Sequence, residues 1–206
     1  MKEDKAGFES ENIKLELTNN CAVIRFIRPE IKNPLSIAAL ETLKEIFISI
    51  QSNSKIETII FTGSGDTFAS GANLNEIAKI DGTTAREFAL RGQNLMQAIY
   101  HSGKLTVAAI DGFCMGGALD LAVSCKTRIA SPRSIFAHPG ANLGIITGWS
   151  GTQILPRLIG EARALEMFLT AKRVDANEAL RIGLIDEITE NPLEFSLANF
   201  RSNLTS

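Results

Sequence analysis

Apolar positions recur along the chain with two different periods, which predicts alternating strands and helices. Residues 13–18 and 21–27 alternate or run apolar with β-branched side chains, and Asn19-Asn20 between them favours a hairpin turn. Further short apolar runs predict strands at 57–63, 105–110, 127–130, 134–138 and 183–188. A chain with this many short apolar runs is expected to bury at least one sheet.

Helical periodicity fills the intervals between these strands. Residues 36–53 carry Leu40, Leu43, Phe47 and Ile50 on one face, and Ser36 is placed to cap the helix. Other helices are predicted at 84–100, 116–125, 160–170 and 175–183, the last with Asp175 as N-cap, Glu178 at the capping-box position and Gly183 at its end. The alternation predicts an α/β fold in which helices cover mostly parallel sheets.

Composition narrows the class of protein. The 206 residues are 45% hydrophobic and 21% charged, which suits one domain with one sizeable core. A formal net charge of -2 provides no broad basic surface, so we expect neither nucleic acid nor a membrane surface as a partner. Three widely spaced cysteines match neither a disulfide framework nor a metal site, and no metal is predicted. The polar N-terminus and the absence of a long apolar run predict a cytoplasmic protein.

Two glycine-containing loops are the main candidates for chemistry. Residues 62–74 and 111–120 each follow an apolar strand, and small residues there leave backbone N–H groups accessible. Two such amides can converge on one oxygen and stabilise negative charge, and Gly117 also opens a helix. Taken singly, either loop is better explained as a tight turn than as an oxyanion-binding loop.

Several consecutive segments resemble the enoyl-CoA hydratase/isomerase (crotonase) family, in the family's order and over nearly the whole chain. They are residues 28–35, 68–74, 108–131, 136–160 and 162–188. The resemblance implies a single crotonase-like (ClpP/crotonase) domain over residues 1–206, a spiral of repeated ββα units that lacks most of the family's C-terminal helical cap. It also implies a homotrimer or hexamer, and an acyl-CoA substrate whose coenzyme A is the only cofactor, with no prosthetic group.

The resemblance also assigns site residues. Ser70-Gly71-Ala72-Asn73 matches the family's AGAD loop with two departures, Ser for Ala and Asn for Asp. The resemblance implies that the backbone amides of Ser70 and Gly117 hold the thioester oxygen. The residues that the resemblance places against the substrate or its coenzyme A part are Arg28, Asn33, Leu35, Ser70, Gly71, Ala72, Asn73, Gly116, Gly117, Gly140 and Trp149. Trp149 replaces a small residue of the family pattern, and it is expected either to shorten the acyl pocket or to fill the core.

The acid/base groups depart from the family pattern. Family hydratases use two glutamates, and the matching positions here are Asp120 and Gly140. Asp120 is therefore the predicted catalytic acid/base, with a side chain one methylene shorter than the family's. His138 is a weaker catalytic candidate, because a lone histidine at a strand end is more often a structural hydrogen-bonding group.

Three functions remain open from the sequence. The favoured one is an acyl-CoA lyase or isomerase that stabilises a thioester enolate, with hydration and double-bond isomerisation undecided. The second is a non-catalytic acyl-CoA binder or assembly subunit, favoured by the missing carboxylate at Gly140 and the short C-terminus. The third, a serine hydrolase with Ser70 as nucleophile, is disfavoured because no motif places a histidine beside that serine.

Overall fold

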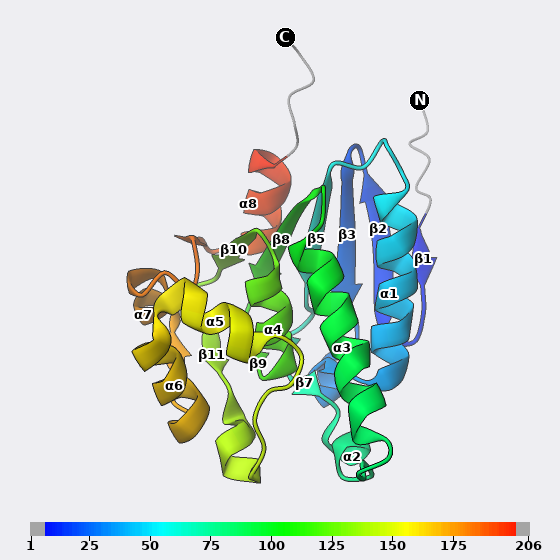
Figure 1. The fold of residues 1–206 in the computed structure, drawn as a ribbon. Coiled ribbons are helices and arrows are strands. Elements are labelled where there is room, and N and C mark those ends of the chain that lie inside the picture. The colour runs from blue at the N-terminus through cyan, green and yellow to red at the C-terminus, as the bar shows by residue number, and fades with distance from the viewer. Residues whose placement is uncertain (1–6, 201–206) are drawn as a thin grey trace.

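The computed structural model describes residues 7–200, which form two larger sheets, one two-stranded sheet and eight α-helices (Figure 1). The largest sheet has seven strands in the order β1-β2-β3-β5-β8-β10-β13. Its strands are β1 (Phe8–Glu9), β2 (Ile13–Thr18), β3 (Cys21–Phe26), β5 (Thr58–Thr62), β8 (Leu105–Ile110), β10 (Thr127–Ala130) and β13 (Glu187–Ile188). β2 and β3 form the predicted antiparallel hairpin, with Asn19 at a φ of 54°, and the strands from β3 to β13 are parallel.

Short strands that follow those of the large sheet build the other two sheets. The four-stranded sheet has the order β12-β11-β9-β6, and β4 pairs with β7. These strands are β4 (Pro34–Leu35), β6 (Thr67–Ala69), β7 (Gly71–Ala72), β9 (Phe113–Met115), β11 (Ile135–Ala137) and β12 (Val174–Asp175). Because a strand of the large sheet, a short strand and a helix recur in this order, the predicted spiral of ββα units is confirmed.

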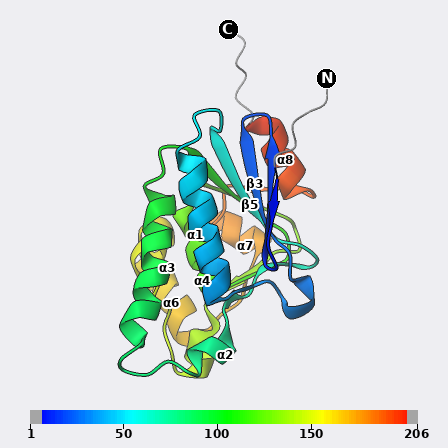
Figure 2. The ribbon, with the colours of Figure 1, turned by 90° about the vertical axis from the view of Figure 1, so that its right-hand side faces the viewer.

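Helices cover both faces of the large sheet. They are α1 (Ile37–Gln51), α2 (Leu74–Ile77), α3 (Ala85–Tyr100), α4 (Gly117–Ser124), α5 (Gly151–Ile159), α6 (Glu161–Thr170), α7 (Ala176–Arg181) and α8 (Pro192–Asn199). α1, α3 and α4 lie on one face and α8 on the other, as the rotated view shows (Figure 2). Leu193 and Phe195 of α8 pack on Val23, Ile60 and Val107 of the sheet. No helix between residues 7 and 200 has the length and apolar content needed to span a lipid bilayer.

The local signals that predicted the helices are present in the structure. The Ser36 side chain accepts a hydrogen bond from the Ala39 amide, and Asp175 accepts one from the Glu178 amide. α4 is the short, buried helix that was expected, because its residues from Ala118 to Ser124 are all buried. The last predicted strand is shorter than expected, since only Glu187 and Ile188 pair with β10.

Candidate active site

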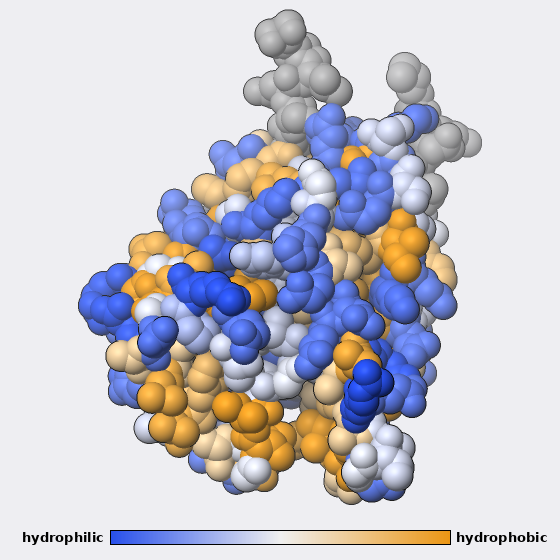
Figure 3. Space-filling view, viewed as in Figure 1, coloured by the Kyte–Doolittle hydropathy of each residue, from blue (hydrophilic) through white to orange (hydrophobic). Residues whose placement is uncertain are grey.

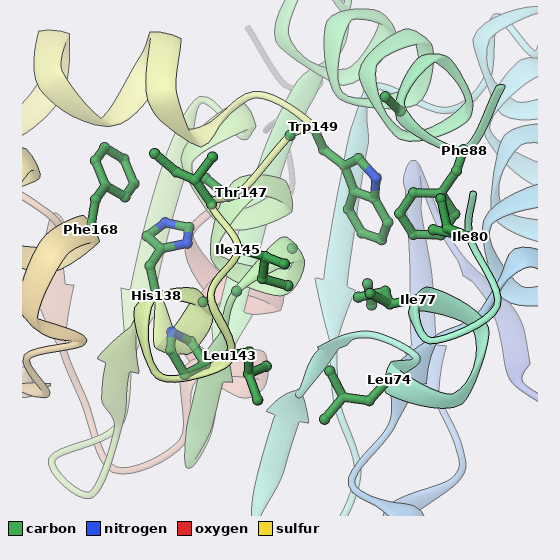
Figure 4. Close-up of a pocket in the computed structure, with 18 of the residues that line it drawn as sticks. Leu74, Ile77, Ile80, Phe88, His138, Leu143, Ile145, Thr147, Trp149 and Phe168 are labelled. Carbon is green, nitrogen blue, oxygen red and sulfur yellow. The ribbon is translucent and has the colours of Figure 1, made fainter. Parts of the chain in front are cut away.

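One apolar pocket of about 460 Å³ lies between the 138–149 segment and helices α2 and α3 (Figure 4). Leu74, Ile77 and Phe88 line one side, and Leu143 and Ile145 line the other. Its remaining wall includes both glycine-containing loops, through Ser70, Ala72, Gly116 and Gly117. The pocket therefore combines a backbone-lined floor with walls suited to a hydrocarbon group.

A buried asparagine fixes the first loop. Asn33 donates through Nδ2 to the carbonyls of Ser64 and Thr67, at 3.1 and 2.7 Å, and its Oδ1 accepts from the Arg28 amide at 2.8 Å. Its own carbonyl accepts a long hydrogen bond of 3.4 Å from the Ser70 amide. The amide assigned to the thioester oxygen is thus partly engaged in holding the loop.

The two loops meet at Gly71. Its φ is +86°, and a Cβ atom there would lie 2.6 Å from the Met115 carbonyl oxygen and 2.8 Å from the Gly117 nitrogen. Only glycine allows both this backbone conformation and this close approach. Gly71 does not line the pocket itself, but its lack of a side chain lets the first loop lie against the start of α4.

The Gly117 amide is free to bind a ligand. Gly117 is the first residue of α4, so its N–H has no acceptor within the helix, and it donates no hydrogen bond to any other acceptor in residues 7–200. Gly116 before it has a φ of 55°, which turns the chain from β9 into the helix. The N–H therefore lies at the positive end of the α4 dipole and on the pocket wall.

Ala72 is a second donor candidate in the first loop, and the sequence did not single it out for that role. β4 and β7 pair in parallel, with Pro34 opposite Gly71 and Leu35 opposite Ala72. Because Pro34 has no N–H, Leu35 must donate to this ladder, and alternate amides of a parallel strand face the same neighbour. The Gly71 amide then faces β4, and that of Ala72 is directed away from it.

Asp120 lies behind the pocket wall. Its side chain is 0% exposed and does not line the pocket. Its Oδ2 accepts hydrogen bonds from the Thr147 hydroxyl and from the Ser150 amide at 3.3 Å, whereas Oδ1 has no hydrogen-bond partner. Burial raises the pKa of this carboxyl to about 6, although the donors from Thr147 and Ser150 act in the opposite direction.

His138 is the titratable side chain that lines the pocket. It is only 3% exposed, and its ring packs against Phe168 with 5.0 Å between the ring centroids (Figure 4). Its Nε2 lies 3.6 Å from Asp120 Oδ1, and neither ring nitrogen makes a hydrogen bond. Burial lowers the pKa of this imidazole to about 4, so the ring is neutral at pH 7.

Gly140 leaves no room for the carboxylate that family hydratases carry there. The 3₁₀ turn Pro139–Leu143 folds the chain back, and the Ile145 amide donates to the Gly140 carbonyl at 3.0 Å. A Cβ atom at Gly140 would lie 2.5 Å from the Ile145 carbonyl oxygen. A longer side chain there would require the backbone of this turn to move.

Trp149 is both buried and part of the pocket wall. Its indole packs against Phe88 (Figure 4), with 5.7 Å between the ring centroids. The residue is only 4% exposed. A Cβ atom at Gly92 or at Gly117 would overlap the indole ring. Two glycines on α3 and α4 therefore make the space that this side chain occupies.

Other predicted contact residues lie away from this pocket. Arg28 pairs with Glu11 and Glu30 at the surface, and Leu35 is buried in the core. Asn73 caps α2 by accepting from the Asn75 amide. The predicted contacts of Arg28, Asn33, Leu35 and Asn73 with coenzyme A stay predictions. Within residues 7–200, no three His, Cys, Asp or Glu side chains gather into a possible metal site.

Comparison with known proteins agrees with this geometry. The sequence profile described as enoyl-CoA hydratase/isomerase matches residues 16–195. The chain belongs to the enoyl-CoA hydratase/isomerase family. The family resemblance of the sequence is therefore confirmed, and so is the crotonase-type fold.

Relatives of this family match most of the chain. The crotonyl-CoA hydratase of Syntrophomonas wolfei is 37% identical over 181 residues, which are 87% of this chain and 70% of the relative. The short-chain-enoyl-CoA hydratase of Clostridium acetobutylicum is 34% identical over 183 residues, which are 88% of this chain and 70% of the relative. The crystal structure of enoyl-CoA hydratase from Bacillus anthracis superposes with a TM-score of 0.85 at 33% identity, covering 91% of this chain and 74% of that one.

Proposed function

We propose that this member of the family is an enzyme that binds an acyl-CoA thioester and stabilises its enolate, as an enoyl-CoA hydratase or isomerase does. The observation that supports the proposal is the close approach of the two loops at Gly71, because Ser70 and Ala72 of the first loop and Gly117 of the second line one pocket. Two N–H groups that converge on a thioester oxygen stabilise the charge that develops when a proton leaves the neighbouring carbon.

Of the two backbone N–H donors to the thioester oxygen, one is assigned to a single residue and the other has two candidates. Gly117 supplies the first N–H, because that amide has no acceptor among the described residues. Ser70 was predicted to supply the second, and its bond to Asn33 is long enough, at 3.4 Å, to be exchanged for a ligand. Ala72 competes for the same role, because its N–H is directed away from β4. Either residue completes a pair with Gly117.

The pocket favours a short apolar acyl group. Its walls are aliphatic and aromatic, and Trp149 fills the space between α3 and α4 that a longer chain would need. The relatives named crotonyl-CoA hydratase and short-chain-enoyl-CoA hydratase support the same substrate class. Family membership and a formed pocket favour an enzyme over the non-catalytic binder.

The proposal is tested by incubating the protein with a panel of 2-enoyl-, 3-enoyl- and 3-hydroxyacyl-CoA thioesters with four to ten acyl carbons. The products are followed by mass and by ultraviolet absorbance. We expect turnover of the four-carbon compounds and little of the longest. A gain of water identifies a hydratase, and movement of the double bond without a mass change identifies an isomerase. Binding without turnover of any compound would contradict the proposal and favour the binder.

The same panel applied to Trp149→Ala tests the length limit. Removing the indole opens space beside Phe88, so kcat/KM for the longer thioesters should rise relative to the four-carbon one by about tenfold, the effect of one or two pocket methylenes. Because losing a buried Trp costs about 3–5 kcal/mol of stability, folding is checked by circular dichroism first. An unchanged chain-length profile in folded protein would mean that Trp149 only fills the core.

We also propose a trimer or a pair of trimers. Leu165 and Leu169 of α6 are 56% and 67% exposed, and Ile146 beside the pocket is 62% exposed. Figure 3 shows apolar side chains on this lower part of the molecule. Exposed apolar patches of this kind favour burial between subunits. Sedimentation at micromolar concentration is expected to show the trimer, and a monomer there would contradict it.

A further inference from the structure

The Asp120 carboxylate is separated from the substrate space by the pocket wall. Its side chain is 0% exposed and does not line the pocket, so a proton that leaves a substrate needs an intermediate group to reach it. Among residues 7–200, the Thr147 hydroxyl is the one side-chain group that donates a hydrogen bond to this carboxylate. Thr147 is also part of the pocket lining (Figure 4). It therefore connects the carboxylate with the substrate space.

His138 does not provide a second route. It lines the pocket, and its Nε2 lies 3.6 Å from Asp120 Oδ1, but both ring nitrogens are buried and make no hydrogen bond. Burial lowers the pKa of this imidazole to about 4 and raises the pKa of the Asp120 carboxyl to about 6, so the carboxylate is the stronger base of the two. The proton acceptor is therefore the carboxylate.

A threonine hydroxyl can serve both neighbours at once. It has one proton to donate and two lone pairs that accept, so its oxygen can accept from a group in the pocket while it donates to Asp120 Oδ2. Gly151 makes room for this arrangement, because a Cβ atom there would overlap Asp120 Oδ1 and lie 2.8 Å from the Thr147 methyl carbon. The Ser150 amide also donates to Oδ2, at 3.3 Å, and helps to hold the carboxylate in place.

We propose that Thr147 is a catalytic residue of this site, a proton relay between the substrate and the buried Asp120 carboxylate. This inference rests on the proposed thioester chemistry. In the step, a proton leaves the carbon next to the thioester carbonyl, or a water that adds to the double bond, and moves to Thr147 Oγ1 as the hydroxyl's own proton moves to Asp120 Oδ2.

The electrons balance in either case. When a carbon–hydrogen bond breaks, its electron pair passes to the thioester oxygen that the backbone amides hold. When water adds, its oxygen forms the new bond to carbon, and the electron pair of the double bond passes to the same thioester oxygen. The reverse movement returns the proton from Asp120 through Thr147 to a substrate carbon and restores both side chains. No reactant besides the thioester and, for hydration, water is needed.

The relay fits the length and the charge of the acid/base group. Asp120 is one methylene shorter than the glutamate of the family pattern, and the Thr147 hydroxyl bridges the remaining distance to the pocket. The other groups that face Asp120 are Ser150, His138 and the Cys114 thiol of β9, whose pKa burial raises well above its usual value. At pH 7 the carboxyl is therefore ionised, and its titratable neighbours are neutral.

Thr147→Val and Thr147→Ser test the proposal, because valine keeps the shape of the side chain without the hydroxyl and serine keeps the hydroxyl. Thr147→Val should lower kcat for the four-carbon thioesters about 10²-fold and change KM less than about threefold, whereas Thr147→Ser should keep kcat within about threefold of wild type. Thr152→Val is the matched control and should leave kcat unchanged. The Thr152 hydroxyl accepts from the neighbouring Gln153 and does not line the pocket.

The pH profile provides a readout that a merely structural role would not move. Wild type should lose activity as the pH falls through about 6, where Asp120 takes up its proton. The Thr147 donor acts to lower the pKa of this carboxyl, so Thr147→Val should shift this loss to a higher pH and Thr147→Ser should not. Because the two groups act in one path, Thr147→Val should add little to the loss caused by Asp120→Asn.

The outcomes separate this inference from the proposed function. If wild type turns over a thioester and folded Thr147→Val does so with the same kcat and pH profile, the relay is wrong and the proposed function stands. Equal losses in Thr147→Ser and Thr147→Val would assign the effect to the lost methyl group and overturn the relay as well. Wild type that binds thioesters without turning over any of them contradicts the proposed function, and the relay with it. Circular dichroism establishes first that each variant is folded.

Discussion

Gly71→Ala is expected to lower kcat by about 10²–10³-fold, the effect of losing one donor to a developing oxyanion. A methyl group at this position meets the Met115 carbonyl and the Gly117 nitrogen, both of them backbone atoms that cannot rotate away. The first loop must then move off the start of α4, which separates the Gly117 amide from those of Ser70 and Ala72. The loss should fall mainly on kcat, because the apolar walls of the pocket are untouched.

Gly82→Ala is the matched control for this prediction. Nothing lies within 4 Å of a Cβ atom at Gly82, and its φ is not positive, so the same chemical change should leave kcat as in wild type. Since alanine at the φ of Gly71 costs about 1 kcal/mol, urea unfolding must show that the variant is folded at the assay temperature. A folded Gly71→Ala protein with wild-type kcat would show that the loops do not act together.

The buried pair should give two variants with opposite pH dependence of stability. The pKa of Asp120 is raised from 3.8 to about 6, so its contribution to stability is present below pH 4 and lost as the pH rises through 6. The pKa of His138 is lowered from 6.5 to about 4, so its contribution is present above pH 6.5 and lost as the pH falls towards 4. In wild type the two contributions offset each other between about pH 4 and 6.

Removing one partner exposes the contribution of the other. Relative to wild type, Asp120→Asn should gain stability on going from pH 4.5 to 6, and His138→Gln should lose it, each by about 2 kcal/mol over this interval. Urea unfolding at the two pH values measures both, and subtracting wild type removes the other carboxylates. His101→Gln should run parallel to wild type. Parallel behaviour of all four proteins would show that the two groups titrate normally in the folded state.

Local signals in the sequence were sufficient to predict the main elements. Helices α1 and α7 begin where Ser36 and Asp175 can cap them. Such caps can be predicted from sequence, because the capping side chain accepts a hydrogen bond from an amide only three residues further along the chain. The buried helix α4 was predicted from its small apolar residues. By contrast, β6 and β7 lie where a loop was expected, and α2 was not predicted at all, since elements of two to four residues are too short to show a period.

The sequence by itself determined the family, the two glycine loops and the absence of a carboxylate at position 140. Motif order carries that information, and glycine is required wherever backbones approach closely. Only the tertiary structure decided where the side chains point. The 147–150 segment donates to Asp120 and holds its carboxylate behind the pocket wall, while the end of β11 brings His138 to the front. These groups lie many residues apart, so their distances, and the desolvation that shifts both pKa values, arise from packing that no sequence pattern records.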